Sequence, residues 1–195
     1  MLLDEFRAIG MIDRIVPKQK SYRYALLMGS LKEDVIVRLD YFSELKQRGV
    51  IFQEIVLLGS GRPLLDTEKD GLPQEIITES GMMNYLYAQY MTLKNKPPLL
   101  INAPMIKKDD GTFTRPTTDT TLVHFKQTIS ADGSCLVISN NPYIVRQTKV
   151  AQRILHQVRF PIEGAGEKIN LETVDIVMLI DEFVRRLYEE CKQLP

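Results

Sequence analysis

Five short apolar runs alternate along the chain with longer segments of helical periodicity. The first four are apolar without alternation, which is typical of strands buried on both faces of a parallel sheet. The fifth contains Pro161, so we expect an edge strand there. Strands separated by helices predict βαβ units, and therefore an α/β fold with a mainly parallel, five-stranded sheet. The expected strands cover residues 24–28, 55–58, 99–101, 135–138 and 158–162.

Helices are predicted between the strands from capping residues and from apolar residues at three- and four-residue spacing. Ser30 and Glu33 have the spacing of a capping box, and Gly49 suits the position just past the end of the helix that follows. Asn141 and Pro142 suit the N-cap and the first position of another helix. The predicted helices lie between residues 30 and 49, 78 and 93, 118 and 129, and 141 and 155.

Two more helices are expected near the ends of the chain. The segment 3–15 predicts an amphipathic helix packed on the outside. A last helix is expected to begin at Asn170 and to carry Val174, Val177, Val184, Leu187 and Cys191. We therefore expect one domain over residues 1–195, with a helical extension at 1–20, a core at 22–165 and a C-terminal helix at 170–191.

The composition narrows the choice of partners. Lysine plus arginine and aspartate plus glutamate both number 25, and this balance gives no reason to expect nucleic acid or an anionic membrane as main partner. The sequence contains no run of about 18 apolar residues, so no membrane-spanning helix is predicted. Its first residues do not have the features of a signal peptide, and we therefore expect a cytoplasmic protein. The two cysteines have no motif spacing, which suits a reducing compartment and argues against a metal site.

Small and amide-bearing residues follow every predicted strand. In open α/β sheets ligands bind outside the carboxyl ends of the strands, where such residues let a ligand approach the backbone. The same residue types are also common in turns for purely structural reasons. The strand-exit residues are Gly29, Ser30, Gly59, Ser60, Gly61, Arg62, Asn102, Ser139, Asn140, Asn141 and the segment 164–166.

Standard nucleotide-binding motifs are absent from the sequence. The segment 59–61 begins like a dinucleotide fingerprint but lacks its third glycine and the acidic residue further on, and no P-loop is present. His124 and His156 fit no metal or triad spacing, so we expect structural roles for them. Ser60 and Ser139 have no evident base beside them in the sequence.

Charged residues near the strand ends are the candidates for chemistry. Arg62, Arg115 and Arg146 could meet an anion, or they could be surface arginines paired with acids. Glu79 and Asp119 are expected at the same edge of the sheet, where they could transfer protons or orient hydroxyls. Acids in a first helical turn are also favourable for structural reasons alone.

The order of these signals resembles the bacterial YdcF-like family, which includes the SanA and ElyC envelope proteins. The resemblance spans about residues 22–165. It implies a Rossmann-like three-layer α/β fold with a polar cleft at the strand ends. It rests on a helix carrying Arg38, the run IVLLGSG, Thr78-Glu79-Ser80, the segment 117–119 and the run LVISNNPYIVRQTKVAQRIL.

The resemblance also implies roles for single residues, with departures. The family features are matched by Gly59, Gly61, Glu79, Thr117, Asp119, Thr120, Ser139 and Arg146. Asp119 stands where the family has Glu, Thr120 where it has Asn, Tyr143 where it has His, and Gln147 where it has Ala. Many relatives have an N-terminal membrane anchor, and we expect none in this protein.

Two functions are compatible with the sequence. In the first, an anionic or nucleotide-like small molecule binds at the strand ends, and hydrolysis or group transfer is a possible reaction. In the second, the chain is a non-catalytic interaction protein that uses the long segment 102–117 as a partner surface. The sequence names no cofactor and no oligomeric state. Beside Glu79 and Asp119 as catalytic residues, the first function assigns ligand binding to Gly29, Ser30, Gly59, Ser60, Gly61, Arg62, Thr117, Thr120, Ser139, Asn140, Asn141 and Arg146.

Overall fold

Five parallel strands form the central sheet of the computed structural model, which describes residues 2–90, 97–129, 132–155 and 161–192. Their spatial order is β3-β2-β1-β6-β7, so the strand order reverses between β1 and β6. The segment 102–117 contains a small antiparallel hairpin, β4 (Ile106–Lys107) with β5 (Phe113–Thr114). The five sheet strands are β1 (Ser21–Met28), β2 (Ile51–Ser60), β3 (Leu99–Ala103), β6 (Cys135–Asn140) and β7 (Ile162–Glu167).

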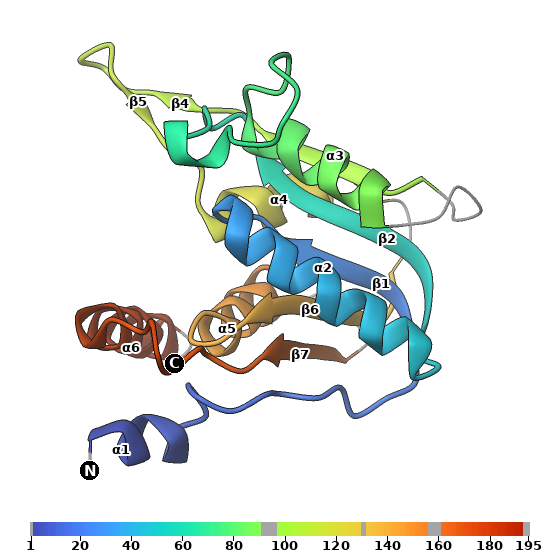
Figure 1. Cartoon of the computed structure of the whole chain (residues 1–195), viewed down its shortest axis with the longest axis vertical. Helices are drawn as coiled ribbons and strands as arrows, with labels where there is room; N and C mark the ends of the chain where they lie inside the picture. The colour runs from blue at the N-terminus through green and yellow to red at the C-terminus, as the bar shows by residue number, and fades with distance from the viewer. Residues whose placement is uncertain (1, 91–96, 130–131, 156–160, 193–195) are drawn as a thin grey trace.

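Helices cover both faces of this sheet and make a Rossmann-like three-layer sandwich (Figure 1). Helices α2 (Lys32–Gln47) and α3 (Glu79–Tyr90) pack on one face. Helices α4 (Thr118–Thr128) and α5 (Ile144–Ile154) pack on the other. The α/β class and the parallel five-stranded sheet predicted from the apolar runs are therefore confirmed.

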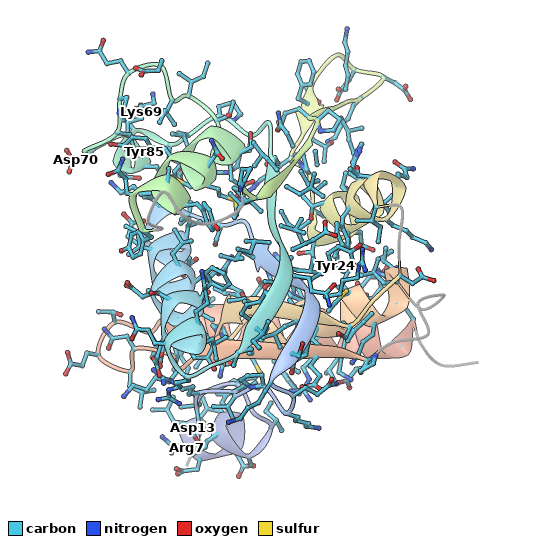
Figure 2. All side chains as sticks on the ribbon, turned by 90° about the vertical axis from the view of Figure 1, so that its right-hand side faces the viewer. Arg7, Asp13, Tyr24, Lys69, Asp70 and Tyr85 are labelled. Atoms are coloured by element: carbon cyan, nitrogen blue, oxygen red, sulfur yellow. The ribbon has the colours of Figure 1, made fainter. Side chains whose placement is uncertain are left out.

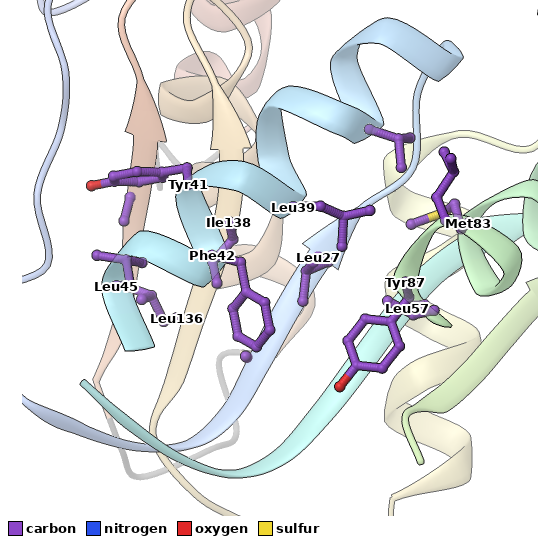
Figure 3. Close-up of a cluster of buried hydrophobic side chains, with 14 of the residues drawn as sticks. Leu27, Leu39, Tyr41, Phe42, Leu45, Leu57, Met83, Tyr87, Leu136 and Ile138 are labelled. Atoms are coloured by element: carbon purple, nitrogen blue, oxygen red, sulfur yellow. The ribbon is translucent and has the colours of Figure 1, made fainter. Parts of the chain in front are cut away.

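Alternate residues of each buried strand supply the two cores. Leu27 of β1 faces α2 and α3 and belongs to the cluster drawn in Figure 3, where Phe42 and Tyr87 lie nearby. Tyr24 of the same strand faces the opposite layer (Figure 2), with its ring 5.4 Å from that of Phe125 in α4. Successive side chains of a strand point to opposite faces of the sheet. Because helices cover both faces, nearly every position must be apolar, and these runs therefore show no apolar–polar alternation in the sequence.

The fifth strand lies at the edge of the sheet, as Pro161 predicts, but its position differs from the prediction. β7 begins at Ile162, and residues 156–160, including His156, lie outside the described part of the chain. Residues 164–166 are therefore inside the strand rather than at its exit. A Cβ at Gly164 would lie 2.1 Å from Thr148 Oγ1, and a Cβ at Gly166 would lie 3.1 Å from Ile144 Cβ. These glycines therefore allow α5 to pack closely on β7.

Two predicted helix starts are wrong. Ser30 does not cap α2, because its hydroxyl donates to the Asp34 carboxylate instead, although Gly49 ends this helix with φ +84° as predicted. Asn141 is not the N-cap of α5, which begins at Ile144 after a cis Asn141–Pro142 bond. The Asn141 N–H donates to the Glu167 carbonyl, so the residue just past the end of β6 is still hydrogen-bonded to β7 and does not start a helix.

The C-terminal helix α6 (Ile176–Cys191) begins later than predicted. Asp175 caps it by accepting the Val177 N–H at 2.8 Å. Its buried residues are Leu179, Glu182 and Glu189. Of the residues expected in this helix, Val177, Val184, Leu187 and Cys191 are exposed, and Val174, which lies before the helix, is partly buried.

The N-terminal helix α1 (Leu2–Ala8) is shorter than predicted and packs against α6. Phe6 forms a small cluster with Met11, Ile12 and Leu179, and its ring lies 6.4 Å from that of Phe183. An ion pair between Arg7 and Asp13 links the helix to the segment that follows (Figure 2). Among the described residues, no helix combines the length and apolar character needed to cross a lipid bilayer.

Candidate functional site

A cavity of about 640 Å³ opens at the carboxyl ends of β1 and β2, and we call it the strand-end cavity. It lies beside the point where the strand order reverses, which is the usual ligand position in such sheets. Its walls come from the exits of β1 and β2, the start of α3, the loop before α4, the first turn of α5 and one side of α6. The charged lining residues are Asp34, Arg38, Glu79, Arg115, Arg146, Asp181, Glu182 and Arg185.

Arg38 of α2 forms the most deeply buried charged part of this lining, with only 1 % of its surface exposed. Its Nε donates to the Asn140 side-chain oxygen, and its Nη1 donates to the carbonyls of Met28 and Gly29, each at 2.8 Å. All three acceptors are neutral. Asp34 is linked to Arg38 through Asn140, whose amide donates to the Asp34 carboxylate at 2.9 Å, and Glu79 adds a second negative field. Burial lowers the pKa of Arg38, and the field of Asp34 acts in the opposite direction.

Glu79, the first residue of α3, supplies a buried carboxylate to the cavity. The Ser60 hydroxyl donates to one of its oxygens. Guanidinium nitrogens of Arg62 and Arg115 lie 3.7 and 3.9 Å from the other oxygen. Its place at a helix N-terminus adds a favourable dipole interaction.

Arg146 is compensated by a carboxylate of α6. It lies in the first turn of α5 and forms an ion pair with the buried Glu182, and both side chains line the strand-end cavity. Burial raises the pKa of Glu182, while Arg146 acts to lower it. An arginine near a helix N-terminus opposes the helix dipole, and Glu182 accounts for its presence here.

Gln147, the next residue, has an unsatisfied group in the same cavity. Its side chain is 6 % exposed, and its Oε1 has no hydrogen-bond partner among the described residues. A buried amide oxygen without a donor costs roughly 1–3 kcal/mol. The cavity is therefore lined by a buried cation, Arg38, whose hydrogen-bond partners are all neutral, and by a buried acceptor, Gln147 Oε1, that has no hydrogen-bond donor among the described residues.

The structure brings together only some of the residues predicted to bind a ligand. Asn140 and Asn141 line a neighbouring cavity of about 950 Å³ at the ends of β6 and β7, which shares Asp34, Tyr143 and Met178 with the first. The predicted residues that line the strand-end cavity are Gly29, Ser30, Ser60, Glu79, Thr117 and Arg146.

Six predicted site residues line neither cavity, namely Gly59, Gly61, Arg62, Asp119, Thr120 and Ser139. Asp119 pairs with Arg153 on α5, so it does not share the ligand edge with Glu79 as expected. Thr120 closes a capping box with Thr117 at the start of α4. Ser139 is fully buried in β6.

Arg62 and the two glycines have structural contacts that account for them. Arg62 makes two hydrogen bonds of 2.6 and 2.8 Å to Glu68, which lies in a short 3-10 turn (Asp66–Glu68). A Cβ on Gly59 would lie 2.9 Å from Ser80 Cα, so this glycine permits close packing of α3 on β2. The Gly61 N–H donates to the Ala103 carbonyl at 2.8 Å.

Sequence reasoning missed Arg38, Gln147 and Glu182 as site residues. A signal existed for Arg38, because it falls on the same helical face as Val35, Leu39 and Phe42, and a charged residue on an otherwise apolar face is rarely accidental. Glu182 has no comparable signal, because the side of α6 on which it lies also carries Glu189 and Glu190. Nothing local distinguishes Gln147, whose position depends on the packing of α5.

Comparison with known protein families, curated proteins and solved structures found no match. The resemblance to the YdcF-like family therefore stays a prediction, and the function is argued from the site. Within the described ranges, no group of three or more His, Cys, Asp and Glu side chains is placed to hold a metal ion.

Proposed function

We propose that the chain binds a small anionic molecule, of the nucleotide or sugar-phosphate class, in the strand-end cavity. Arg38 carries this proposal. Buried charges in proteins are normally paired, yet its guanidinium is bonded to two carbonyls and one amide oxygen. A phosphate or carboxylate in the cavity would supply the missing negative charge in a geometry suited to a guanidinium.

Arg115 and Gln147 suggest what else the ligand carries. Arg115 stands at the rim with a side chain 55 % exposed, where it can contact a second anionic oxygen. The Gln147 Oε1 needs a donor, which a sugar hydroxyl or a base amino group provides. A molecule with one anionic end and several hydroxyl or amino groups matches both demands.

Glu79 is the carboxylate best placed for proton transfer if the bound molecule reacts. Asp119 pairs with Arg153 and does not line the cavity, so the predicted pair of acids is not formed. Glu79 remains, and it accepts a hydrogen bond from Ser60. In a hydrolysis or group transfer, Glu79 would take a proton from the Ser60 hydroxyl or from a substrate hydroxyl held in its place. The resemblance to the YdcF-like family, with its polar cleft at the strand ends, agrees with this location.

One observation favours the alternative of an interaction protein. The β4–β5 hairpin exposes 48 % of Ile106 and 60 % of Phe113. Such a hairpin can serve as a partner surface without any small-molecule ligand. The first function requires a small molecule bound in the strand-end cavity, whereas the interaction protein requires none.

A thermal-shift panel of nucleotides, S-adenosylmethionine and sugar phosphates tests the proposal. A ligand at about 100 times its dissociation constant adds about 2.7 kcal/mol, which raises the midpoint by about 5–10 °C in a chain of this length. Arg115→Ala is expected to weaken binding about tenfold, since it removes a charged hydrogen bond.

Gln147→Met gives a sharper result. It removes an unsatisfied oxygen, so we expect the midpoint of the free protein not to fall while ligand affinity drops about tenfold. Lys69→Ala, on the exposed surface away from the lining, is the control and should change neither. Binding that survives both cavity variants would contradict the assigned site, and a flat panel would favour the interaction protein.

A further inference from the structure

The helix α6 packs on the body of the protein through charged residues. Arg146 pairs with Glu182, Arg153 with Glu189 at 2.9 Å, and Lys149 with Glu190 at 3.2 Å. Glu182 and Glu189 are both buried. Leu179 is buried as well, in the cluster with Phe6, but a surface helix normally exposes its charged residues, so the two buried glutamates are unusual.

The opposite side of the helix carries a continuous apolar surface, which we call the outer face of α6. Its large residues are between 43 and 66 % exposed. They are spaced three and four residues apart in turn, which is the spacing of a coiled-coil seam. An apolar stripe of this kind on a protein surface marks an interaction site. The outer face consists of Val177, Ile180, Val184, Leu187, Tyr188 and Cys191.

We propose that the outer face of α6 pairs with the same face of a second copy of this chain, antiparallel and centred near Val184. In an antiparallel two-fold pair, residues face each other when their numbers add to a constant. With Val184 near the axis the sum is 368, so Ile180 lies opposite Tyr188 of the second copy, and Val177 lies opposite its Cys191. These residues of the seam therefore meet one another across the pair.

Charge complementarity selects this orientation. Asp181 and Arg185 lie on one flank of the seam, paired with each other at 2.7 Å and 58 and 62 % exposed. An antiparallel pair brings the same flanks of both copies together, so Asp181 comes within about 3 Å, measured along the helix axis, of the level of Arg185 of the second copy. In a parallel pair these flanks lie on opposite sides of the seam and gain no contact.

The flanking charges also favour a second copy over a membrane surface. Helices that lie in a lipid interface carry a surplus of lysine and arginine beside the apolar face. Here one acid and one base flank the seam, and the whole chain is neutral. Asp181 and Arg185 also line the strand-end cavity, so pairing places Arg185 of the second copy at its mouth.

Sedimentation equilibrium of the full chain tests the pairing. We expect a mass of twice 22.4 kDa at 100 µM protein. Val184→Asp should raise the dissociation constant of the dimer at least 100-fold, and circular dichroism checks that this variant is folded. Ile77→Asp, at a similarly exposed position in the loop before α3, is the matched control and should remain dimeric. A monomeric wild type at this concentration would overturn the proposal.

Disulfide cross-linking tests the geometry. Val184→Cys with Cys191→Ser should form a covalent dimer on oxidation, because the two positions meet near the axis, while Cys135 is buried and silent. Val177→Cys should cross-link only when Cys191 is retained, since two copies of position 177 lie about 20 Å apart at 1.5 Å per residue.

Three other results would contradict the inference. Cross-linking of Val177→Cys in the Cys191→Ser background would indicate a parallel pair. Failure of Val184→Cys to cross-link in a dimeric protein would place the interface elsewhere. A monomeric protein that floats with phosphatidylserine vesicles, and no longer does so as Val184→Asp, would assign the outer face of α6 to a membrane surface.

Discussion

At the scale of single residues, two buried arginines beside the strand-end cavity are compensated in different ways. Arg62 has a carboxylate partner, Glu68, which also accepts the Leu65 N–H at 2.8 Å. Arg38 has only neutral partners. The charge of Arg62 is balanced without a ligand, although its Nε has no hydrogen-bond partner among the described residues, whereas Arg38 would gain a counter-charge from an anion. This difference, rather than position in the sequence, separates a structural arginine from a candidate binding residue.

Glu68→Gln is expected to make stability less dependent on pH. Burial raises the pKa of Glu68, but hydrogen bonds from Arg62 and from the Leu65 N–H outweigh it and hold the pKa below the ordinary 4.5. The unfolded chain therefore binds a proton first as the pH falls. The stabilisation is present above pH 4.5 and is lost as the pH drops through the lower folded-state value.

Urea unfolding at pH 7, 5, 4 and 3 measures this effect. At pH 7 Glu68→Gln should cost about 3 kcal/mol, because it leaves the Arg62 charge buried without its counterion. The difference from wild type should shrink below pH 4.5. Asp66→Asn, at a carboxylate that is almost fully exposed, is the control and should have a much smaller effect. A difference that is constant with pH would show that Glu68 titrates normally.

At the scale of secondary-structure elements, close approaches between helices and strands explain several residues that looked functional in sequence. Gly59 lies under α3, and Gly164 and Gly166 lie under α5. The sequence predicts each of them at a strand exit, where a ligand is expected to bind. Helix packing alone accounts for them, because an added Cβ would strike the neighbouring helix.

Gly59→Ala and Gly61→Ala form a matched pair that tests this packing. A Cβ at position 59 would lie 2.9 Å from the Ser80 backbone, so Gly59→Ala should destabilise the protein by about 1–3 kcal/mol. At position 61 the nearest atom is 3.7 Å away, so Gly61→Ala should be neutral or stabilising by up to about 1 kcal/mol. Thermal unfolding measures both, and equal effects would contradict the packing explanation.

At the scale of the whole molecule, pairing through α6 makes stability depend on concentration. Unfolding of a dimer releases two chains, so each tenfold increase in protein concentration adds about 1.4 kcal/mol per dimer. For a chain of this length the midpoint should rise by about 2 °C per tenfold increase. Scanning calorimetry at three concentrations measures it, and Val184→Asp should abolish the dependence. A wild-type midpoint independent of concentration would contradict the pairing.

Local sequence patterns predicted most of the fold but only part of the candidate site. Buried parallel strands need continuous apolar runs, so four of the five strands were located from sequence, and β7 was displaced only by a few residues. Glu79 and Arg146 were found because helix starts at strand exits meet at one sheet edge. Asp119 was misplaced because its ion pair with Arg153 depends on how α4 and α5 pack together, which no local signal encodes.

The sequence by itself determined the alternation of strands and helices, since apolar periodicity follows from which face of each element must leave water. Only the tertiary structure decided which side of α6 turns inward. Its apolar stripe predicts burial, yet Arg146 and Arg153 of α5 attract Glu182 and Glu189, and the apolar side is left outward. The same dependence on long-range contacts placed Arg38 among neutral partners and left Gln147 unpaired in the strand-end cavity.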